Sequence, residues 1–152
     1  MPLRAYRVTR AVHPVFDGTG AARFGARWTS PGHPVIYAAG SYAGALLETL
    51  VHARRLALRE PYHAMVITIP DSVRITVVDA DAVPGWDAPD YVASRRIGDA
   101  WLARRATAVL QVPSLTGRPH EVNLLIDPMH PDVRRLSLGH AHDVVWDGRL
   151  LS

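Results

Sequence analysis

The sequence predicts a mixed α+β domain, and three observations lead to this fold class. The chain has 152 residues, about the length of one domain, so we expect a single domain over residues 1–152. Its apolar fraction of 48% and charged fraction of 20% are ordinary for a globular protein that buries its own core. Predicted strands outnumber predicted helices and do not alternate strictly with them, which favours α+β over a doubly wound parallel sheet.

The first part of the chain predicts two strands, a long loop and a helix. Residues 5–12 form the first expected strand, and a Gly/Pro-rich loop over residues 13–33 follows. A loop of that length inside a domain is more often functional than not. A short strand over residues 35–39 then leads to Ser41, which we expect to cap a helix over residues 42–58. The apolar positions of this helix predict one buried face: Ala43, Leu46, Leu47, Leu50, Val51, Ala57 and Leu58.

The second part predicts strands around one helical region. The helical region follows Pro89, and we expect it in two pieces around Gly98, ending near Arg105. Four strands and two short tail strands complete the prediction, over residues 63–69, 73–78, 107–112, 121–126, 133–138 and 142–146.

Composition excludes several classes of protein. The chain has no cysteine, which rules out zinc–thiolate sites, disulfide scaffolds and cysteine nucleophiles. It contains neither a GxGxxG sequence nor a P-loop, so no Rossmann or Walker site is indicated. The closest histidine pair, His140 and His142, has no carboxylate or third histidine at helical spacing, so we expect no metal.

Charge and hydropathy predict the location of the protein and limit its partners. All seventeen basic residues are arginines, and they occur as scattered pairs rather than as a stripe interleaved with aromatic residues. We therefore expect no direct nucleic-acid partner. No run approaches 18 apolar residues and the N-terminal residues lack an apolar leader, so we expect a cytoplasmic protein without a membrane partner.

Two polar residues interrupt the local patterns of the helix and of a strand end. Glu48 lies roughly 130° from the centre of the apolar stripe of its helix, at about 100° per residue. It is either part of a solvated face or a functional carboxylate. Two facts favour the functional carboxylate: the chain has only three glutamates, and the i+4 position carries His52 where a surface ion pair would usually have an arginine. Ser114 follows an apolar strand without a GxSxG sequence, and is either a turn serine or a hydroxyl projected into a cleft.

Two further residues allow a structural and a functional reading. Asn123 is the only asparagine of the chain and interrupts a predicted strand, where its amide either fixes a loop or binds a ligand. Tyr37 lies in the short strand over residues 35–39 and is either a core aromatic with its hydroxyl at the rim or part of a site.

Several motifs in register resemble one family. The stretches Gly25-Ala26-Arg27-Trp28, Val35-Ile36-Tyr37-Ala38, Leu46 to His52, Val112-Pro113-Ser114, Asn123 with Asp127 to Pro131, and Val145 to Leu150 occur in the order of the RES-domain family. That family is named for an arginine, a glutamate and a serine. The resemblance covers nearly the whole chain, with Ala26 and Asp127 standing where the family usually has glycine and asparagine.

The resemblance implies a fold and an activity. RES proteins are similar to toxins of bacterial type II toxin–antitoxin systems, neutralised by an antitoxin with an Xre-like helix-turn-helix domain. Their fold resembles that of ADP-ribosyltransferases, which implies split antiparallel β-sheets with flanking helices. Members consume NAD as substrate without a metal, and pass ADP-ribose to a protein target, to phosphate or to water.

The resemblance also implies roles for five residues. Glu48 would stabilise the positive charge that develops on the ribose, and Arg27 would bind the phosphates of NAD. Tyr37 and Ser114 would contact the nicotinamide or its ribose, and Asn123 would hold the Ser114 loop. An antitoxin is expected to cover this cleft. The alternative is a non-catalytic module that binds a nucleotide or a partner protein.

Overall fold

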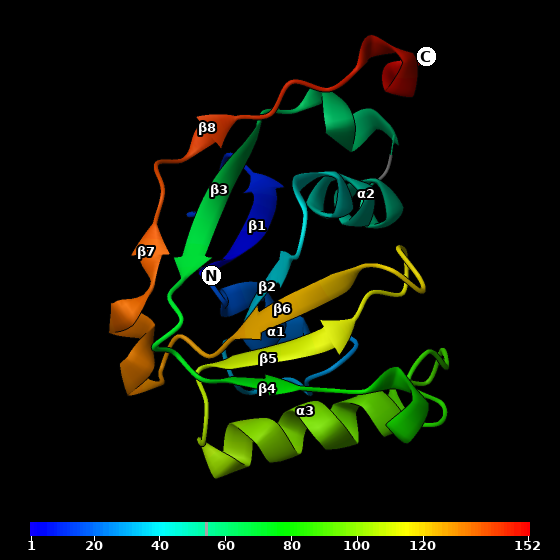
Figure 1. The fold of residues 1–152 in the computed structure, drawn as a ribbon. Helices are drawn as coiled ribbons and strands as arrows, with labels where there is room; N and C mark the ends of the chain where they lie inside the picture. Colours follow the sequence, from blue (N-terminus) through cyan, green and yellow to red (C-terminus); the bar gives the residue numbers. More distant parts are fainter. Residues whose placement is uncertain (54) are drawn as a thin grey trace.

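Eight strands and three α-helices lie within residues 1–53 and 55–152, the part of the chain that the computed structural model describes (Figure 1). In chain order they are β1 (Leu3–Arg10), α1 (Thr19–Phe24), β2 (Ile36–Ala39), α2 (Tyr42–His52), β3 (Tyr62–Ile69), β4 (Ile75–Val77), α3 (Val92–Arg104), β5 (Val109–Pro113), β6 (Val122–Ile126), β7 (Ser137–Leu138) and β8 (His142–Asp143). Short 3-10 helices occur at Arg55–Arg59, Ala80–Ala82, Pro131–Arg135 and Gly148–Leu151. The predicted α+β class is confirmed.

The strands form one curled sheet that is nearly divided in two. Its order is β4-β5-β6-β2-β1-β3-β7, and β8 also pairs with β3. The strands β1 and β2 share only the register pair Tyr6↔Ala39, whereas β1 and β3 pair along eight residues. Two arms of the sheet therefore meet at a narrow junction, as the expected split sheets require. The pairing is antiparallel except between β4 and β5, which run parallel.

Helix α2 begins where the sequence predicts and ends earlier. The Ser41 hydroxyl accepts a hydrogen bond from the Gly44 N–H at 2.9 Å and caps the first turn. The helix ends at His52; the predicted continuation includes residue 54, which lies outside the described residues, and a 3-10 helix follows. The predicted buried face is partly wrong, because the sheet covers only part of the apolar stripe: Leu47 is 40% and Val51 60% exposed.

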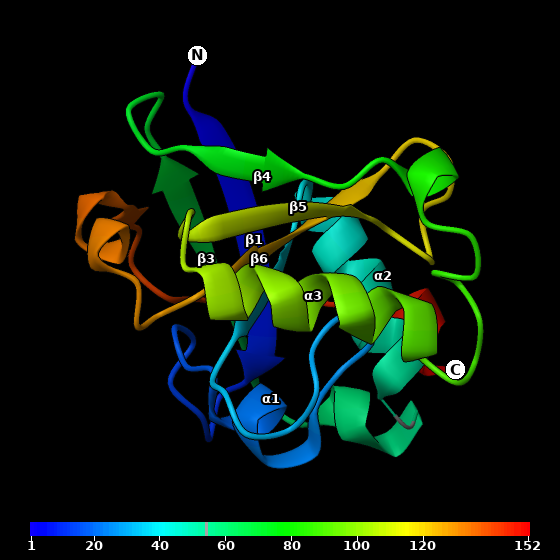
Figure 2. The ribbon, with the colours of Figure 1, turned by 90° about the horizontal axis from the view of Figure 1, so that it is seen from below.

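Helix α3 runs unbroken through Gly98 along the β4–β5 edge (Figure 2). The prediction of two helical pieces is wrong, because Gly98 allows α3 to approach the backbone of Trp28 closely and does not interrupt the helix. A Cβ atom at Gly98 would lie 1.6 Å from the carbonyl oxygen of Trp28, so only glycine admits this contact. The long loop predicted over residues 13–33 contains the short helix α1.

The remaining elements follow the predictions to within a few residues, with one difference in the tail. Residues 131–135 form a 3-10 helix where a strand was expected, and β7 and β8 are two residues long each. Among the described residues, no helix is both long and apolar enough to cross a membrane.

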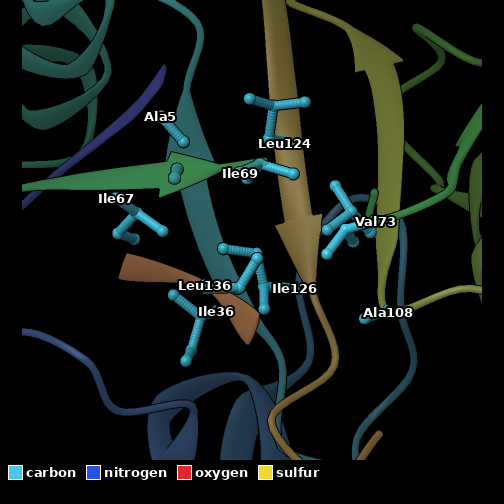
Figure 3. Close-up of a cluster of buried hydrophobic side chains, with 11 residues drawn as sticks. Ala5, Ile36, Ile67, Ile69, Val73, Ala108, Leu124, Ile126 and Leu136 are labelled. Carbon is cyan, nitrogen blue, oxygen red and sulfur yellow. The ribbon is translucent and has the colours of Figure 1, made fainter. Parts of the chain in front are cut away.

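Two apolar clusters pack the sheet. The first gathers side chains from β1, β2, β3 and β6 between the two arms, as Figure 3 shows for Ile36, Ile67 and Leu124. The second lies between α3 and the β5–β6 arm, and consists of Trp28, Val35, Trp86, Trp101, Leu110, Val112 and Leu125. The indoles of Trp28 and Trp86 stack here, with ring centroids 5.9 Å apart. This cluster fixes the segment that precedes β2 against α3.

Candidate active site

The carboxylate of Glu48 is the centre of a polar network at the end of the β5–β6 arm. Glu48 lies in the second half of α2, and its side chain is 25% exposed. Its Oε1 accepts hydrogen bonds from Asn123 Nδ2 at 3.0 Å and from Thr116 Oγ1 at 2.8 Å. His52 Nε2 lies 3.7 Å from the other oxygen, Oε2. Three different elements thus converge on one carboxylate.

These contacts keep Glu48 ionised. Burial alone raises the pKa of the carboxyl, but hydrogen bonds from His52, Asn123 and Thr116, together with the charge of His52, outweigh it and lower the pKa of Glu48 to about 2. The hydrogen bond to Glu48 in turn raises the pKa of His52, against its burial and the nearby charge of Arg27. At neutral pH the group is a carboxylate and not an acid.

Ser114 is buried just after β5 and joins the same network. Its hydroxyl lies 3.4 Å from Glu48 Oε1 and 3.2 Å from Thr116 Oγ1, and accepts a hydrogen bond from the Gly117 N–H at 3.0 Å. The Ser114 N–H donates to the Glu121 carbonyl at 3.1 Å, which continues the β5–β6 pairing. The loop is therefore fixed by its own backbone and hydroxyl groups.

The sheet register explains how Asn123 reaches Glu48. Asn123 pairs with Val112 of β5 and with Ala39 of β2, close to the point where α2 begins. Because residues directly opposite each other on neighbouring strands point to the same face, Asn123 shares its face of the sheet with Val112. Within the described residues the Asn123 side chain bonds to Glu48 Oε1, the oxygen that Thr116 and Ser114 of the loop also contact.

Arg27 is held by backbone carbonyls from a different part of the chain. Its Nη1 donates to the carbonyl oxygens of Trp86 at 3.2 Å and Ala88 at 3.0 Å, and its guanidinium lies 4.6 Å from the ring centroid of Tyr91. Within the described residues, both hydrogen bonds that the Arg27 side chain donates come from Nη1. Nε and Nη2 donate no hydrogen bond within the described part of the chain.

Arg27 lies in the same region as Glu48 without bonding to it. Its positive charge acts on His52, the neighbour of the carboxylate, and lowers the pKa of that imidazole. Arg27 and Glu48 are each held by their own protein partners, and His52 experiences the charge of both. Such an arrangement suits a ligand with an anionic part and a part that becomes positive during reaction.

Tyr37 is packed against the second apolar cluster. Its hydroxyl lies 2.6 Å from Thr29 Oγ1. Burial raises the pKa of Tyr37 to about 12, against the hydrogen bonds from Thr29 and Trp28, so the phenol stays protonated. No hydrogen bond joins Tyr37 and Glu48 among the described residues, although the sheet register places Tyr37 on the same face as Asn123, which bonds Glu48.

A hollow of about 230 Å³ opens beside Ser114. We call it the Ser114 hollow; it is lined by Ala80, Trp86, Asp87, Pro113, Ser114, Arg118, Pro119 and Glu121. Arg118 Nη1 and Asp87 Oδ2 lie 3.0 Å apart and link the two loops that line it. Neither Glu48 nor Arg27 lines the hollow, so it adjoins the polar network through Ser114 rather than containing it.

With this geometry in place, comparison with known proteins assigns the family. The profile of the RES domain matches residues 4–147 of the chain. The chain belongs to the RES-domain family. The match includes the segments that carry Arg27, Glu48 and Ser114.

Relatives of this RES-domain chain are known toxins. It is 37% identical over 139 residues to the "Prs ADP-ribosylating toxin" of Sphingobium sp. (strain YBL2), which spans 89% of this chain and 86% of that protein. It is 35% identical over 145 residues to "Toxin Res" of Photorhabdus laumondii subsp. laumondii, which spans 88% of this chain and 92% of that protein. The toxin fold in the M. tuberculosis MbcT–MbcA toxin–antitoxin complex matches with a TM-score of 0.79 at 24% identity, covering 95% of this chain and 85% of that chain.

Sequence reasoning gave little or no signal for several groups of the candidate site. Thr116 makes the shortest hydrogen bond to Glu48 but carries no local signal, since threonine is ordinary in a loop. His52 was noticeable only through its i+4 spacing from Glu48. The carbonyls of Trp86 and Ala88, which hold Arg27, leave no trace in residue type and could not be found from the sequence.

Proposed function

We propose that this chain is a toxin that cleaves the bond between nicotinamide and ribose in NAD. The observation that carries the proposal is the carboxylate of Glu48, held ionised by Asn123, Thr116 and His52. Membership in the RES-domain family supports it, and so does a relative named as an ADP-ribosylating toxin.

The charge state of Glu48 suits this chemistry. When the nicotinamide–ribose bond breaks, its electron pair stays on the nicotinamide nitrogen and the ribose carbon becomes oxocarbenium-like. An anion beside the ribose stabilises that positive charge, and a carboxyl with a pKa of about 2 is an anion throughout the physiological range. Nicotinamide leaves as a neutral molecule, so no general acid is required at Glu48.

Arg27 is proposed to bind the pyrophosphate of NAD. A planar guanidinium donates two parallel N–H groups to a phosphate, and the Nε and Nη2 atoms of Arg27 form such a pair. The bonds from Nη1 to Trp86 and Ala88 then fix the orientation of the fork before NAD arrives. Loss of either contact would allow the guanidinium to rotate and would weaken the binding of the phosphates.

The nicotinamide end is proposed to lie against Ser114. The Ser114 hollow has apolar walls from Trp86 and Pro113, which suit a flat ring, and the Ser114 hydroxyl lies where it meets the polar network. Asn123 holds the carboxylate, and Tyr37, which packs against the second apolar cluster, is proposed to contact the nicotinamide ribose. No metal enters this proposal.

Release of nicotinamide from NAD by the purified chain tests the proposal. We expect Glu48→Gln and Arg27→Ala to abolish release, because each removes one of the two fixed charges. Arg23→Ala, an exposed arginine of α1, and Glu60→Gln, an exposed glutamate, are the matched controls and should retain wild-type rates. NAD binding without release would instead make the chain a binding module, and normal rates in both site variants would reject the site.

The acceptor of ADP-ribose is tested by following the label. We propose that ADP-ribose passes to a protein, to phosphate or to water, and the relative from Sphingobium, named for Prs, makes Prs the first protein to test. NAD labelled in its adenylate part is incubated with the chain and with Prs, with phosphate or with buffer alone. Label on Prs indicates transfer, ADP-ribose phosphate indicates phosphorolysis, and free ADP-ribose indicates hydrolysis.

A cognate antitoxin is proposed to cover the site. The fold match is to a toxin solved together with its antitoxin, and Leu47 and Val51 of α2 expose apolar surface beside Glu48. We propose an antitoxin with an Xre-like helix-turn-helix domain, and expect its addition to stop nicotinamide release. Charged substitution of Leu47 or Val51 should weaken that inhibition without changing the rate of the free toxin.

A further inference from the structure

The backbone around Arg27 is held by polar side chains of α3. The buried Ser94 hydroxyl donates to the Arg27 carbonyl oxygen at 2.5 Å. The neighbouring Arg95 Nε donates to the Ala26 carbonyl oxygen at 2.9 Å. Two consecutive carbonyls of the segment are thus bound to the first turns of one helix.

The next turn of α3 holds the segment beyond Arg27. Gly98 touches the carbonyl of Trp28, in the close approach described above. Asp99 accepts two hydrogen bonds from a single residue: the Ser30 N–H at Oδ1, 2.9 Å away, and the Ser30 hydroxyl at Oδ2, 2.6 Å away. Asp99 is therefore the side chain of α3 that fixes both a backbone and a side-chain group of the segment.

These contacts matter because the segment has little regular structure of its own: one backbone hydrogen bond, from the Ala26 N–H to the Thr29 carbonyl at 2.9 Å, lies within its described residues. Residues 25–32 contain neither helix nor strand, and Gly25 and Gly32 take positive φ values of 69° and 117° at its two ends. A segment of this kind has many backbone conformations in isolation. The four holding residues of α3, at positions 94, 95, 98 and 99, share one face of the helix, since neighbours on a helix surface lie three to four residues apart. One face of α3 therefore contacts residues 26, 27, 28 and 30 of the segment.

We infer that Asp99 is a positioning residue for the binding of NAD phosphates, acting through Ser30 on the direction of the Arg27 side chain. Ser30 is three residues beyond Arg27, so a shift of its backbone moves the Cα atom from which the guanidinium extends. A misplacement of about 1 Å at a binding group is enough to lower activity about a hundredfold. This inference rests on the proposed function, because it takes Arg27 as the group that binds the phosphates.

Three variants of α3 test the inference in the full chain. Asp99→Ala removes both contacts to Ser30, whereas Asp99→Asn retains an oxygen for the Ser30 N–H and offers an amide N–H to the Ser30 hydroxyl. Arg96→Ala, on the exposed face of the same helix, is the control. We expect Asp99→Ala to raise the KM for NAD about tenfold with a smaller change in kcat, and Asp99→Asn and Arg96→Ala to stay within about twofold of wild type.

A double-mutant cycle separates positioning from a general loss of stability. Binding of ADP-ribose is measured by calorimetry for wild type, Arg27→Ala, Asp99→Ala and the double variant. If Asp99 acts through Arg27, Asp99→Ala weakens binding about tenfold in the wild-type background and by less than about twofold when Arg27 is absent. Should Asp99→Ala fail to fold, Ser30→Ala replaces it in the cycle, since it removes one hydroxyl from the same contact.

The outcomes distinguish this inference from the proposed function. An active wild type whose KM is unchanged by Asp99→Ala, or an equal loss of binding in both backgrounds, overturns the positioning role alone. A wild type that neither releases nicotinamide nor binds ADP-ribose overturns the proposed function, and the inference with it. A rise in KM that Asp99→Asn reverses and that vanishes without Arg27 supports both.

Discussion

The charge of Glu48 should contribute to stability in a pH window that can be worked out from its contacts. Its pKa falls from the ordinary 4.5 to about 2 in the folded chain. A folded-state pKa below the unfolded value means that the contribution is fully present above about pH 4.5 and is lost as the pH falls toward about 2. Glu48→Gln keeps the shape of the protonated side chain and removes its charge, so it serves as the reference.

The size of the effect follows from the shift. At about 1.4 kcal/mol per pKa unit, the full shift corresponds to about 3 kcal/mol. A quarter of the Glu48 side chain is open to solvent, and screening there reduces the value to about 1 to 2 kcal/mol. More than half of that contribution should be gone by about pH 3, since this lies well below the unfolded pKa.

Urea unfolding followed by tryptophan fluorescence measures this contribution. We expect wild type to exceed Glu48→Gln in the free energy of unfolding by about 1 to 2 kcal/mol at neutral pH, and the difference to shrink steadily below about pH 4.5. A difference that stays constant down to about pH 3, or one that grows as the pH falls, would refute the assignment of Glu48 as a stabilised carboxylate.

Three further predictions concern the Glu48 network and helix α3. Gly98→Ala should lower the free energy of unfolding by about 3 kcal/mol or more in urea denaturation, because its Cβ would meet the Trp28 carbonyl at 1.6 Å. Asn123→Ala should slow nicotinamide release about tenfold to a hundredfold, because it removes a charge-assisted hydrogen bond to Glu48. In an NMR titration, the pKa of His52 should lie above 6.5 in wild type and fall in Glu48→Gln, which lacks the partner that raises it.

Each of these predictions has a control and an outcome that contradicts it. Gly20→Ala adds the same Cβ where nothing lies within 4 Å, so equal destabilisation by both glycine variants would reject the close-approach argument. Val122→Ala changes the residue beside Asn123 without touching Glu48, and a matching fall in its rate would point to a general effect on β6. A His52 titration that is the same in Glu48→Gln as in wild type would show that the ion pair does not form.

The fold could be predicted from the sequence where local patterns decide it. Strand positions followed from short apolar runs between turn residues, and Ser41 was correctly expected to begin α2. Gly98 was misread because its role depends on Trp28, seventy residues earlier, and nothing nearby in the sequence reports that contact. The buried face of α2 was partly misread for a similar reason, since periodicity shows which residues are apolar but not how far the sheet extends to cover Leu47 and Val51.

The sequence pointed to charged and polar side chains of the candidate site, but not to the groups that hold them in place. Glu48 stood out through the rarity of its residue type and Asn123 through its place in a strand, and the structure brings these two side chains into contact. The roles given to Arg27, Ser114 and Tyr37 came from the family resemblance and stay predictions. The groups that hold the charges are a loop threonine, backbone carbonyls and the polar face of α3, and each is identifiable only once the chain is folded.

The order in which the chain is synthesised has a consequence for a cell that makes this protein. Glu48 is translated early, but its partners Ser114, Thr116 and Asn123 follow 66, 68 and 75 residues later. Until Asn123 has left the ribosome, a growing chain holds the carboxylate without the groups that orient it. Under the proposed activity, a fragment from translation stalled before Asn123 would lack the arrangement that holds the carboxylate.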